Sequence, residues 1–324
     1  MNIVTLAGGV GGAKLAQGLA LTPIPTPTLG EGSVTIIVNT GDDFEWHGLY
    51  VCPDLDTVMY TLGGLANAQT GWGIAGDTFE ALGALRRLGV DAWFNVGDRD
   101  LATHVYRTSL LRQGKTLTEA TQTMTRALGI QATILPMTDD RFRTLIETDQ
   151  GALEFQEYFV QRQWQPVIKR IIFDGAETAQ ATPQVKAALQ HADAIIIAPS
   201  NPFVSIEPIL NVTPTPPLPR RDGGGSKGGG LPVAAVSPIV GGQAIKGPAA
   251  KMFRELGWEP SAVAVAQHYQ GLVTHFVLDR LDADLESAIQ SLGMQTLVTN
   301  TIMQSLEDRT RLATEVVDFV TSNE

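Results

Sequence analysis

A glycine-rich turn near the N-terminus constrains the fold more than any other stretch of this sequence. The apolar residues 3–6 are followed at once by four glycines, and then by Lys14. The glycines are Gly8, Gly9, Gly11 and Gly12. This order predicts a buried strand, a tight turn and a helix. Glycines let backbone N–H groups approach a ligand, and a helix N-terminus favours anions, so the turn predicts a phosphate site.

The turn matches neither of two common nucleotide-binding patterns. It lacks the third glycine of G-x-G-x-x-G, and Lys14 does not satisfy the spacing G-x-x-x-x-G-K-[ST]. A strand-to-helix turn whose glycines only permit close packing is therefore the structural alternative to a phosphate site.

The composition indicates a large globular protein and excludes several classes of partner. The chain has 324 residues, of which 44% are hydrophobic, enough for one elaborated α/β domain or two domains. Its formal charge of −11 argues against binding to nucleic acid or to an anionic membrane. Cys52 is the one cysteine, and no apolar run reaches the ~18 residues of a membrane helix. We expect a cytoplasmic protein without a secretory signal.

Acidic and polar residues follow the second predicted strand, residues 34–38. Asn39, Thr40, Asp42 and Asp43 come directly after it. Ligands of open parallel sheets bind at the carboxyl ends of the strands, so this position supports the first turn. A surface turn is the alternative, since Gly-Asp sequences form turns readily.

Two more aspartates follow shortly. Asp54 and Asp56 precede a predicted helix over residues 57–62, and Asp56 alone could be the N-cap of that helix. Together with Asp42 and Asp43, they supply four carboxylates within fifteen residues. Carboxylate oxygens suit Mg²⁺ that bridges phosphate groups, so the cluster predicts a magnesium site beside the phosphate turn.

Several later segments extend the same pattern. Apolar runs followed by polar residues predict further strands, and one segment predicts an antiparallel pair through a turn at residues 149–151. The predicted sheet strands cover residues 92–96, 133–136, 194–198, 233–236, 263–265 and 274–278, and the antiparallel pair covers 143–148 and 151–155. Helices are predicted near residues 247–256 and 306–320. His104 falls in a predicted helix, where we interpret it as a hydrogen-bonded polar residue.

We therefore predict a Rossmann-like, doubly wound α/β fold with a mostly parallel sheet and an inserted, smaller α+β subdomain. The core is expected over residues 1–138 and 193–324, with the inserted subdomain over residues 139–192. A Pro- and Gly-rich segment over residues 213–231 has the composition of a flexible linker.

The residues alone do not choose the reaction. The sequence contains no nucleophile elbow and no HExxH motif, so nothing supports covalent hydrolysis or zinc catalysis. A phosphoryl-group transferase, a nicotinamide-dependent oxidoreductase and a non-catalytic nucleotide-binding regulator remain.

Six blocks, in the same order, resemble the 2-phospho-L-lactate transferase family of deazaflavin coenzyme biosynthesis. They are AGGVGGAK (7–14), NTGDD (39–43), PDLDT (53–57), GDRD (97–100), APSNP (198–202) and SPI (237–239). The resemblance covers residues 1 to about 320. It implies Mg²⁺-assisted transfer of a phospholactyl or phosphoenolpyruvyl group from a guanosine diphosphate conjugate to the ribityl hydroxyl of the deazaflavin Fo, with release of GMP.

The resemblance also implies roles for individual residues. The phosphates would contact the glycine turn and Lys14, and Asn39, Thr40, Ser200 and Asn201 would border the guanosine. Asp42, Asp43 and Asp54 are the metal candidates. Asp56 matches the Fo-contacting aspartate and is the candidate for orienting or deprotonating the hydroxyl. Asn95 falls at a second Fo-contacting position that is basic in many archaeal relatives. A homodimer is compatible with this fold.

Overall fold

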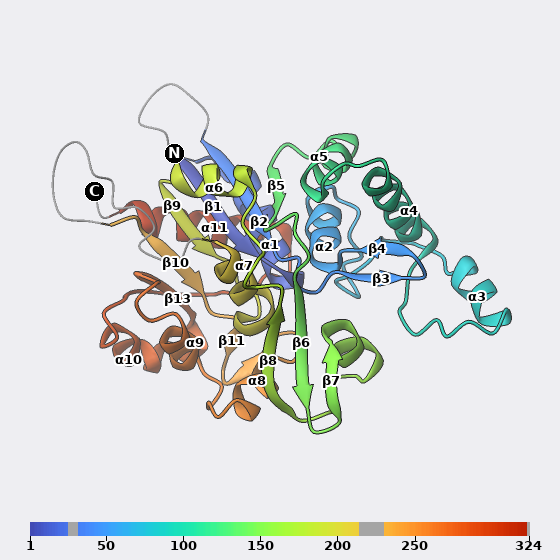
Figure 1. Ribbon diagram of the computed structural model, residues 1–324. Coiled ribbons are helices and arrows are strands. Elements are labelled where there is room, and N and C mark those ends of the chain that lie inside the picture. Colours follow the sequence, from blue (N-terminus) through green and yellow to red (C-terminus); the bar gives the residue numbers. More distant parts are fainter. Residues whose placement is uncertain (25–31, 214–229, 323–324) are drawn as a thin grey trace.

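A parallel sheet of seven strands forms the centre of the molecule (Figure 1). The computed structural model describes residues 1–24, 32–213 and 230–322, so most of the segment predicted as a linker over 213–231 lies outside the described residues. The strands lie in the order β14 (Gln295–Thr299), β13 (His275–Asp279), β10 (Val233–Val236), β9 (Ala194–Ile197), β1 (Asn2–Ala7), β2 (Ser33–Val38) and β5 (Thr133–Pro136).

This strand order confirms the predicted doubly wound, Rossmann-like fold. Sheet strands that follow one another in the chain extend from β1 through β2 to β5, and then from β9 through β10 and β13 to β14. The direction of winding reverses between β1 and β9, which are paired in parallel. Such a reversal opens a crevice at the carboxyl ends of the two central strands, where ligands of these folds bind.

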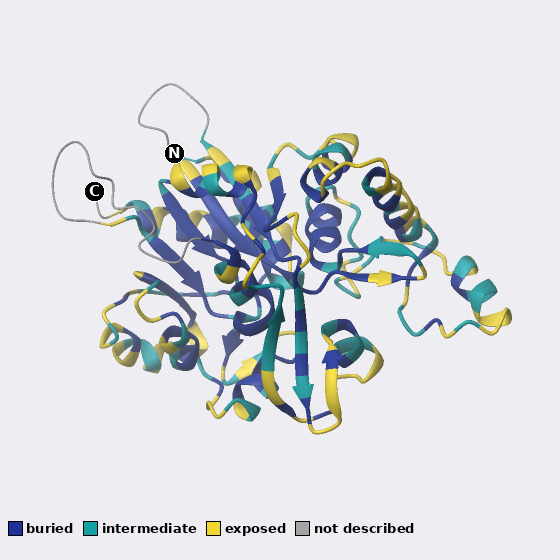
Figure 2. Ribbon diagram, in the orientation of Figure 1, coloured by how far each residue is buried: buried dark blue, intermediate teal, exposed yellow. Residues whose placement is uncertain are grey.

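Helices cover both faces of the sheet, and its strands are buried (Figures 1 and 2). One core contains α1 (Gly9–Leu21), α2 (Pro53–Leu62), α5 (Leu117–Ala127) and α11 (Leu306–Thr321). The other contains α6 (Pro183–Gln190), α7 (Glu207–Val212), α8 (Ala249–Glu255), α9 (Ala262–His268) and α10 (Glu286–Gln290).

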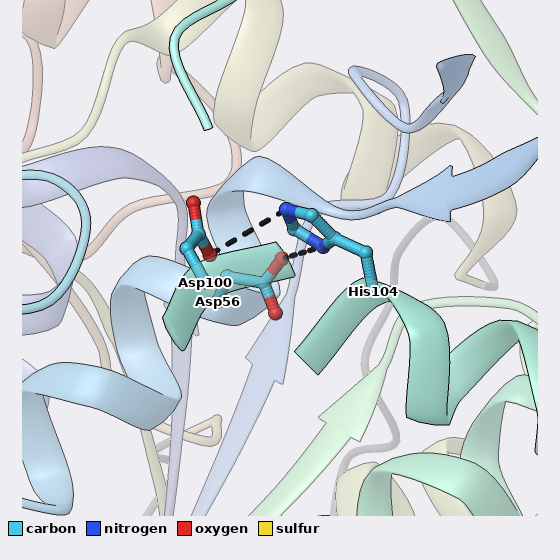
Figure 3. Close-up of side chains that lie close together, drawn as sticks. All are labelled: Asp56, Asp100 and His104. Atoms are coloured by element: carbon cyan, nitrogen blue, oxygen red, sulfur yellow. Dashed lines mark ion pairs between the residues drawn. The ribbon is translucent and has the colours of Figure 1, made fainter. Parts of the chain in front are cut away.

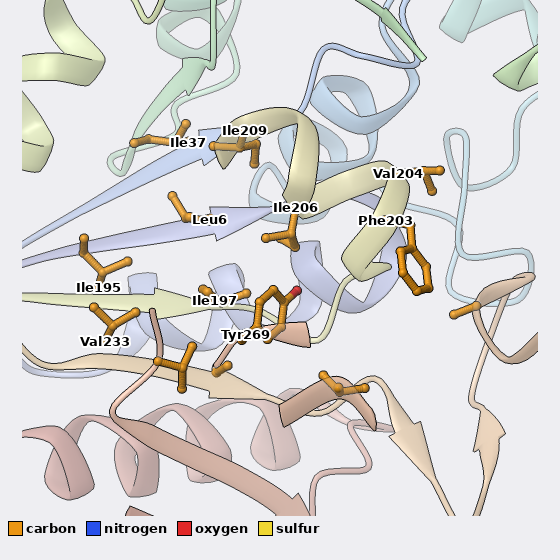
Figure 4. Packing of buried hydrophobic residues seen from close by; sticks show 14 of the residues in the cluster. Leu6, Ile37, Ile195, Ile197, Phe203, Val204, Ile206, Ile209, Val233 and Tyr269 are labelled. Carbon is orange, nitrogen blue, oxygen red and sulfur yellow. The ribbon is translucent and has the colours of Figure 1, made fainter. Parts of the chain in front are cut away.

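Alternation along each strand divides its side chains between the two cores. In β9, Ile195 and Ile197 pack with Leu6 in the second core, as Figure 4 shows, whereas Ile196 packs in the first. Successive side chains of a strand point to opposite faces, so a strand covered on both faces needs a continuous apolar run. The sequence of β9 meets this requirement.

A smaller antiparallel sheet lies beside the carboxyl ends of the main strands. It comprises β7 (Gly151–Glu154), β6 (Arg143–Thr148) and β8 (Ile168–Asp174). The predicted pair is confirmed by the pairing of β6 with β7, and β8 adds a third strand. The N–H of Thr144 donates to the carbonyl oxygen of Gly41 at 2.7 Å, which joins this sheet to the loop after β2.

Besides the main sheet and the antiparallel sheet, another group of elements projects from the core and has α3 at its far end (Figure 1). It comprises the hairpin β3 (Phe44–Trp46) and β4 (Leu49–Val51), α3 (Glu80–Arg87) and α4 (Asp98–Arg112). The remaining elements are short: η1 (Glu157–Gln161), η2 (Pro202–Ile206), β11 (Ile239–Val240), β12 (Gln243–Ala244) and η3 (Arg280–Leu285). Among the described residues, no helix is long and apolar enough to cross a membrane.

Two predicted strands are wrong. Residues 92–96 form no strand, because Ala92 and Val96 are buried by packing in a small cluster with Phe44 and Leu82. Residues 263–265 lie inside α9, where the hydroxyl of Ser261 accepts the N–H of Ala264 and caps the helix. In both cases an apolar run is buried without strand pairing.

Candidate active site

The reversal point brings the glycine turn against the segment that follows β9. A Cβ at Gly11 would overlap the carbonyl oxygen of Pro199, and a Cβ at Gly12 would overlap the hydroxyl of Ser200. Close packing therefore explains these two glycines. The N–H of Gly8 donates to the Oγ of Ser200 at 3.1 Å, so a hydrogen bond also crosses the reversal point.

We expect Gly11→Ala to destabilise the protein by about 1–3 kcal/mol, because the added methyl meets rigid backbone. Gly83→Ala is the matched control. Gly83 lies inside α3 and a Cβ there meets only the end of the Arg87 side chain, at 3.9 Å. The control should gain about 0.5–1 kcal/mol from helix propensity. Urea unfolding measures both changes, and equal stability of the two variants would contradict the packing explanation.

Asp54 lies at the N-terminus of α1, where the resemblance would place a phosphate. The N–H of Gly9 donates to its Oδ1 at 2.6 Å, and Gly9 has a φ of +62°. A Cβ at Gly8 would overlap the other carboxylate oxygen of Asp54. The glycines therefore let a carboxylate approach the first turn of the helix, and a helix N-terminus stabilises such a charge.

Asn39 joins two of the candidate metal ligands. Its side-chain nitrogen lies 3.0 Å from Oδ2 of Asp54, 3.3 Å from Oδ1 of Asp42 and 3.2 Å from the carbonyl oxygen of Val204. Gln156, which follows β7, donates to Oδ2 of Asp42 at 3.0 Å. Asp42 lies on the loop after β2 and Asp54 lies in the first turn of α2, and one amide contacts both carboxylates.

Burial raises the pKa of all three candidate metal ligands. The pKa of Asp42 lies well above its ordinary range, because the carboxyl is buried and the charges of Asp54 and Asp43 are close. Burial raises the pKa of Asp43 to about 8 and that of Asp54 to about 6. Hydrogen bonds from Asn39 and from the N–H of Gly9 oppose the shift at Asp54.

Asp43 has no nitrogen or oxygen donor on either carboxylate oxygen among the described residues, although it is 1% exposed. The hydroxyls of Thr40 and Thr144 are also buried without a hydrogen-bond partner there. Asp42, Asp43 and Thr144 line a small pocket between the loop after β2 and the antiparallel sheet. Buried oxygens without donors are of the kind that a cation could contact. The ligand atoms of Asp42, Asp43 and Asp54 do not, however, converge in this structure, since the group of acidic or histidine side chains that does converge among the described residues is Asp56, Asp100 and His104.

Asp56 forms a buried ion pair with Arg107. Both terminal nitrogens of Arg107 face the carboxylate, and Nη1 lies 3.2 Å from Oδ2. Arg107 is 1% exposed and Asp56 is 4% exposed. Asp56 is not an N-cap, because α2 begins at Pro53 and the N–H of Asp56 donates to the carbonyl oxygen of Cys52 at 2.9 Å.

His104 continues this network on α4 (Figure 3). Its Nδ1 lies 3.6 Å from Oδ2 of Asp56, and its Nε2 lies 3.5 Å from Oδ1 of Asp100. Tyr60 donates its hydroxyl to the same oxygen of Asp100 at 2.7 Å. Asp56, Asp100 and His104 are close enough to share a metal ion. Arg107 already faces both oxygens of Asp56, however, so we interpret the group as an ion-pair network.

Other sequence-predicted residues lie in different surroundings. Lys14 donates its ammonium to the carbonyl oxygen of Met303 at 2.7 Å, on the loop before α11. Asn201 accepts the N–H of Phe203 at 3.0 Å and so caps η2. Asn95 is exposed before α4 and lies 3.4 Å from Arg86, so the structure does not bring it to the glycine turn or the aspartates.

Sequence reasoning missed Arg107 and Gln156, included Asp100 in the GDRD block without giving it a role, and treated His104 as a satisfied polar residue. The spacing of residues 100, 104 and 107 carries a signal, because positions three and four apart share one face of a helix. An ionisable face on a helix that must pack against the core indicates a buried polar network. No sequence pattern of this kind identifies Gln156. It follows β7, and the fold of the antiparallel sheet places it beside Asp42.

Comparison with known proteins identifies the family. A family model described as 2-phospho-L-lactate transferase CofD matches residues 3–311. The chain is 38% identical to a 2-phospho-L-lactate transferase of Methanopyrus kandleri, over 99% of this chain and 98% of that protein. It is also 38% identical to a phosphoenolpyruvate transferase of Streptomyces coelicolor, over 98% of this chain and 97% of that protein.

A solved structure is similar in fold. It is a UPF0052 family protein of Bacillus halodurans, with a TM-score of 0.60, 14% identity and coverage of 98% of both chains. This likeness supports the Rossmann-like architecture alone. The family match and the full-length relatives go further: the chain belongs to the 2-phospho-L-lactate transferase CofD family of enzymes.

Proposed function

We propose that this enzyme transfers a 2-phospholactyl or phosphoenolpyruvyl group from a guanosine diphosphate conjugate to the terminal ribityl hydroxyl of Fo, with release of GMP. One observation carries the proposal beyond family membership. At the reversal point of the sheet, the first turn of α1 meets a buried carboxylate cluster through the contact of Gly9 with Asp54. The turn that we propose to bind phosphate and the aspartates that we propose to bind the cation are therefore in contact.

The proposed reaction needs alignment and charge neutralisation. The hydroxyl attacks the phosphorus distal to guanosine, GMP leaves, and no covalent enzyme intermediate is required. Mg²⁺, held by Asp42, Asp43 and Asp54, would neutralise negative charge on the diphosphate. Lys14 and the N-terminal turn of α1 would bind the phosphates. Such preorganised charges stabilise a phosphoryl-transfer transition state.

Asp56 remains our candidate for the group that orients or deprotonates the ribityl hydroxyl. Its carboxylate is held by Arg107 and His104, which fixes the direction of its oxygens. A carboxylate that cannot rotate presents its remaining acceptor positions in a constant geometry. Arg107 and His104 would then act through Asp56 and contact no substrate themselves.

Asn39 and Thr40, two of the four residues proposed to border the guanosine, are buried in this structure. Asn39 is fully buried and is already engaged with Asp42 and Asp54, so we propose that it positions these ligands. Thr40 is buried too, and its hydroxyl has no hydrogen-bond partner among the described residues. Ser200 and Asn201 remain the proposed guanosine neighbours, and Asn95 remains the proposed second contact with Fo.

The metal-free protein is expected to lose stability as the pH rises from 4 toward 8. The pKa values of Asp43, about 8, and Asp54, about 6, exceed the ordinary 3.8. The folded protein therefore holds protons that the unfolded chain has already released, so rising pH favours unfolding. Mg²⁺ ligation needs ionised carboxylates, so Mg²⁺ should raise the melting temperature more at pH 8 than at pH 6.

Asp54→Asn should abolish most of this response to Mg²⁺, whereas Asp91→Asn should keep it. Asp91 is an exposed carboxylate distant in sequence from Asp54. It has no hydrogen-bond or ion-pair partner among the described residues. Thermal unfolding with and without Mg²⁺ measures the difference. An equal Mg²⁺ response in both variants would exclude Asp54 as a ligand.

Incubation of the purified protein with Fo, Mg²⁺ and each guanosine conjugate in turn tests the proposed function. Chromatography should show GMP in amounts equal to a new deazaflavin product with at least one conjugate. The two relatives with different donors are equally similar, so both conjugates are needed. A nicotinamide-dependent absorbance change, or guanosine-nucleotide binding without any transfer, would contradict the proposal.

We also propose that the enzyme works in the cytoplasm on these small molecules, as a homodimer and without a nucleic-acid or membrane partner. The acidic composition supports this part of the proposal. Gel filtration tests the oligomeric state.

A further inference from the structure

Three cationic side chains from distant parts of the chain gather near the start of α1. Lys14 lies on α1, Lys246 lies on the loop before α8, and Arg309 lies on α11. Both Arg309 and Lys246 lower the pKa of Lys14 through charge repulsion, after the larger effect of its burial. The contacts agree with this. Lys246 lies beside Val10 across Gly71, and Arg309 donates to Gln17, so both border the side of α1 that carries Lys14, because residues 10, 14 and 17 share one face of a helix.

These cations bind only neutral acceptors within the described part of the chain. Lys14 donates to the carbonyl oxygen of Met303 at 2.7 Å, and Lys246 donates to that of Thr70. Arg309 donates from Nη1 to the side-chain oxygen of Gln17. The Nε of Arg309 is buried, and none of the described residues supplies an acceptor for it.

Among residues 1–24, 32–213 and 230–322, no carboxylate lies within ion-pair distance of these three groups. The charge of Asp308 raises the pKa of Lys14, but this is the smallest of the effects that act on that pKa. Its carboxylate is engaged by the N–H and hydroxyl of Ser305, where it completes a capping box. Three adjacent cations without an anion are unusual in a chain with 34 acidic and 23 basic residues.

The cluster adjoins the glycine turn. A Cβ at Gly71 would overlap the ammonium of Lys246 and would lie 3.0 Å from Cγ1 of Val10. Val10 directly follows Gly9, whose N–H contacts Asp54. The cations and the acidic cluster therefore both border the first turn of α1.

We propose that Lys14, Lys246 and Arg309 form a binding subsite for an oxyanion of the donor, either a phosphate or the carboxylate of the transferred acid. This inference rests on the proposed function and adds two residues, Lys246 and Arg309, to its site. Carbonyl and amide oxygens are acceptors that an anion displaces, because charge-assisted hydrogen bonds are stronger than neutral ones. An anion also offsets the repulsion that Lys14 experiences from Arg309 and Lys246.

Lys246→Met and Arg309→Met test the subsite against one control variant. Lys169→Met is the control, because Lys169 is exposed on β8 without an ion-pair partner among the described residues. Each test variant should raise the KM for the guanosine conjugate at least about tenfold and leave the KM for Fo unchanged. Lys246→Arg, which keeps the charge, should recover most of the loss. Thermal unfolding checks that each variant is folded.

Calorimetric titration with GDP identifies the oxyanion. If the subsite binds a phosphate, GDP affinity falls in step with that for the conjugate. If it binds the carboxylate of the acid, GDP affinity is unchanged while the KM for the conjugate still rises. Either result supports an oxyanion subsite, and unchanged KM and GDP affinity in both variants would overturn it.

Turnover of the wild-type enzyme separates this inference from the proposed function. Normal transfer with an unchanged KM in both variants overturns the subsite and keeps the function. Absence of transfer, with GDP binding that the variants weaken, overturns the function and keeps the subsite.

Discussion

Replacing Asp56 by asparagine is expected to lower kcat for transfer at least about a hundredfold, the usual contribution of a general base or its equivalent. The amide keeps the size of the side chain but removes its charge and one acceptor oxygen. The KM for the guanosine conjugate should change little, because Asp56 is proposed to contact Fo. Steady-state GMP release, measured at saturating Fo, gives both constants.

The exposed carboxylate of Asp91 supplies the control for this experiment. Asp91→Asn should leave kcat and the melting temperature unchanged. Since Asp56→Asn also removes the countercharge of the buried Arg107, the folded fraction must be measured and the rate expressed per folded molecule. A folded Asp56→Asn enzyme within about tenfold of the wild-type rate, a barrier change of only ~1.4 kcal/mol, would remove Asp56 from the mechanism.

Arg107→Met is expected to cost about 3–5 kcal/mol of stability, because it leaves the carboxylate of Asp56 buried without its partner. Arg107 also donates to the carbonyl oxygen of Tyr50 at 3.3 Å, so the loss includes a second hydrogen bond. Arg126→Met is the control, since Arg126 is exposed on α5. It should change stability by less than about 0.5 kcal/mol. Urea unfolding measures both changes.

The double variant Asp56→Leu with Arg107→Met separates pairing from packing. Replacing both charges by apolar groups removes the unpaired buried charge, so the double variant should regain most of the stability that Arg107→Met loses. It should remain inactive, because Asp56 is absent. Stability losses that simply add in the double variant would show that the pair is not coupled.

The central strands could be predicted from sequence because burial on both faces demands continuous apolar residues. Residues 194–197 are the clearest case, and they form β9. β14 and β8 escaped detection for the opposite reason. β14 is an edge strand with Gln295 and two threonines, and β8 contains the exposed residues Lys169 and Arg170. Partly exposed strands of this kind lack the uniform pattern that identifies a buried strand.

From the sequence, the candidate site could be predicted only for those residues that come directly after a strand of the main sheet. The Gly, Asn and Asp positions after β1 and β2 were found because the carboxyl edge of a parallel sheet is a known ligand position. The partners of those residues come from outside the sheet. Arg107 reaches Asp56 from a helix 51 positions along the chain, and Gln156 reaches Asp42 over 114 positions. Only the tertiary fold brings such pairs together.

Measuring GMP release in the absence of Fo shows whether the group passes directly between two bound substrates. Excess enzyme is mixed with Mg²⁺ and the conjugate, and GMP is measured over time before and after Fo is added. We predict no GMP before Fo and a burst equal to the bound conjugate afterwards, because the proposed reaction assigns the attack on phosphorus to the hydroxyl of Fo and not to a side chain of the enzyme. A burst of GMP without Fo, which signals hydrolysis or a covalent enzyme intermediate, would contradict the account.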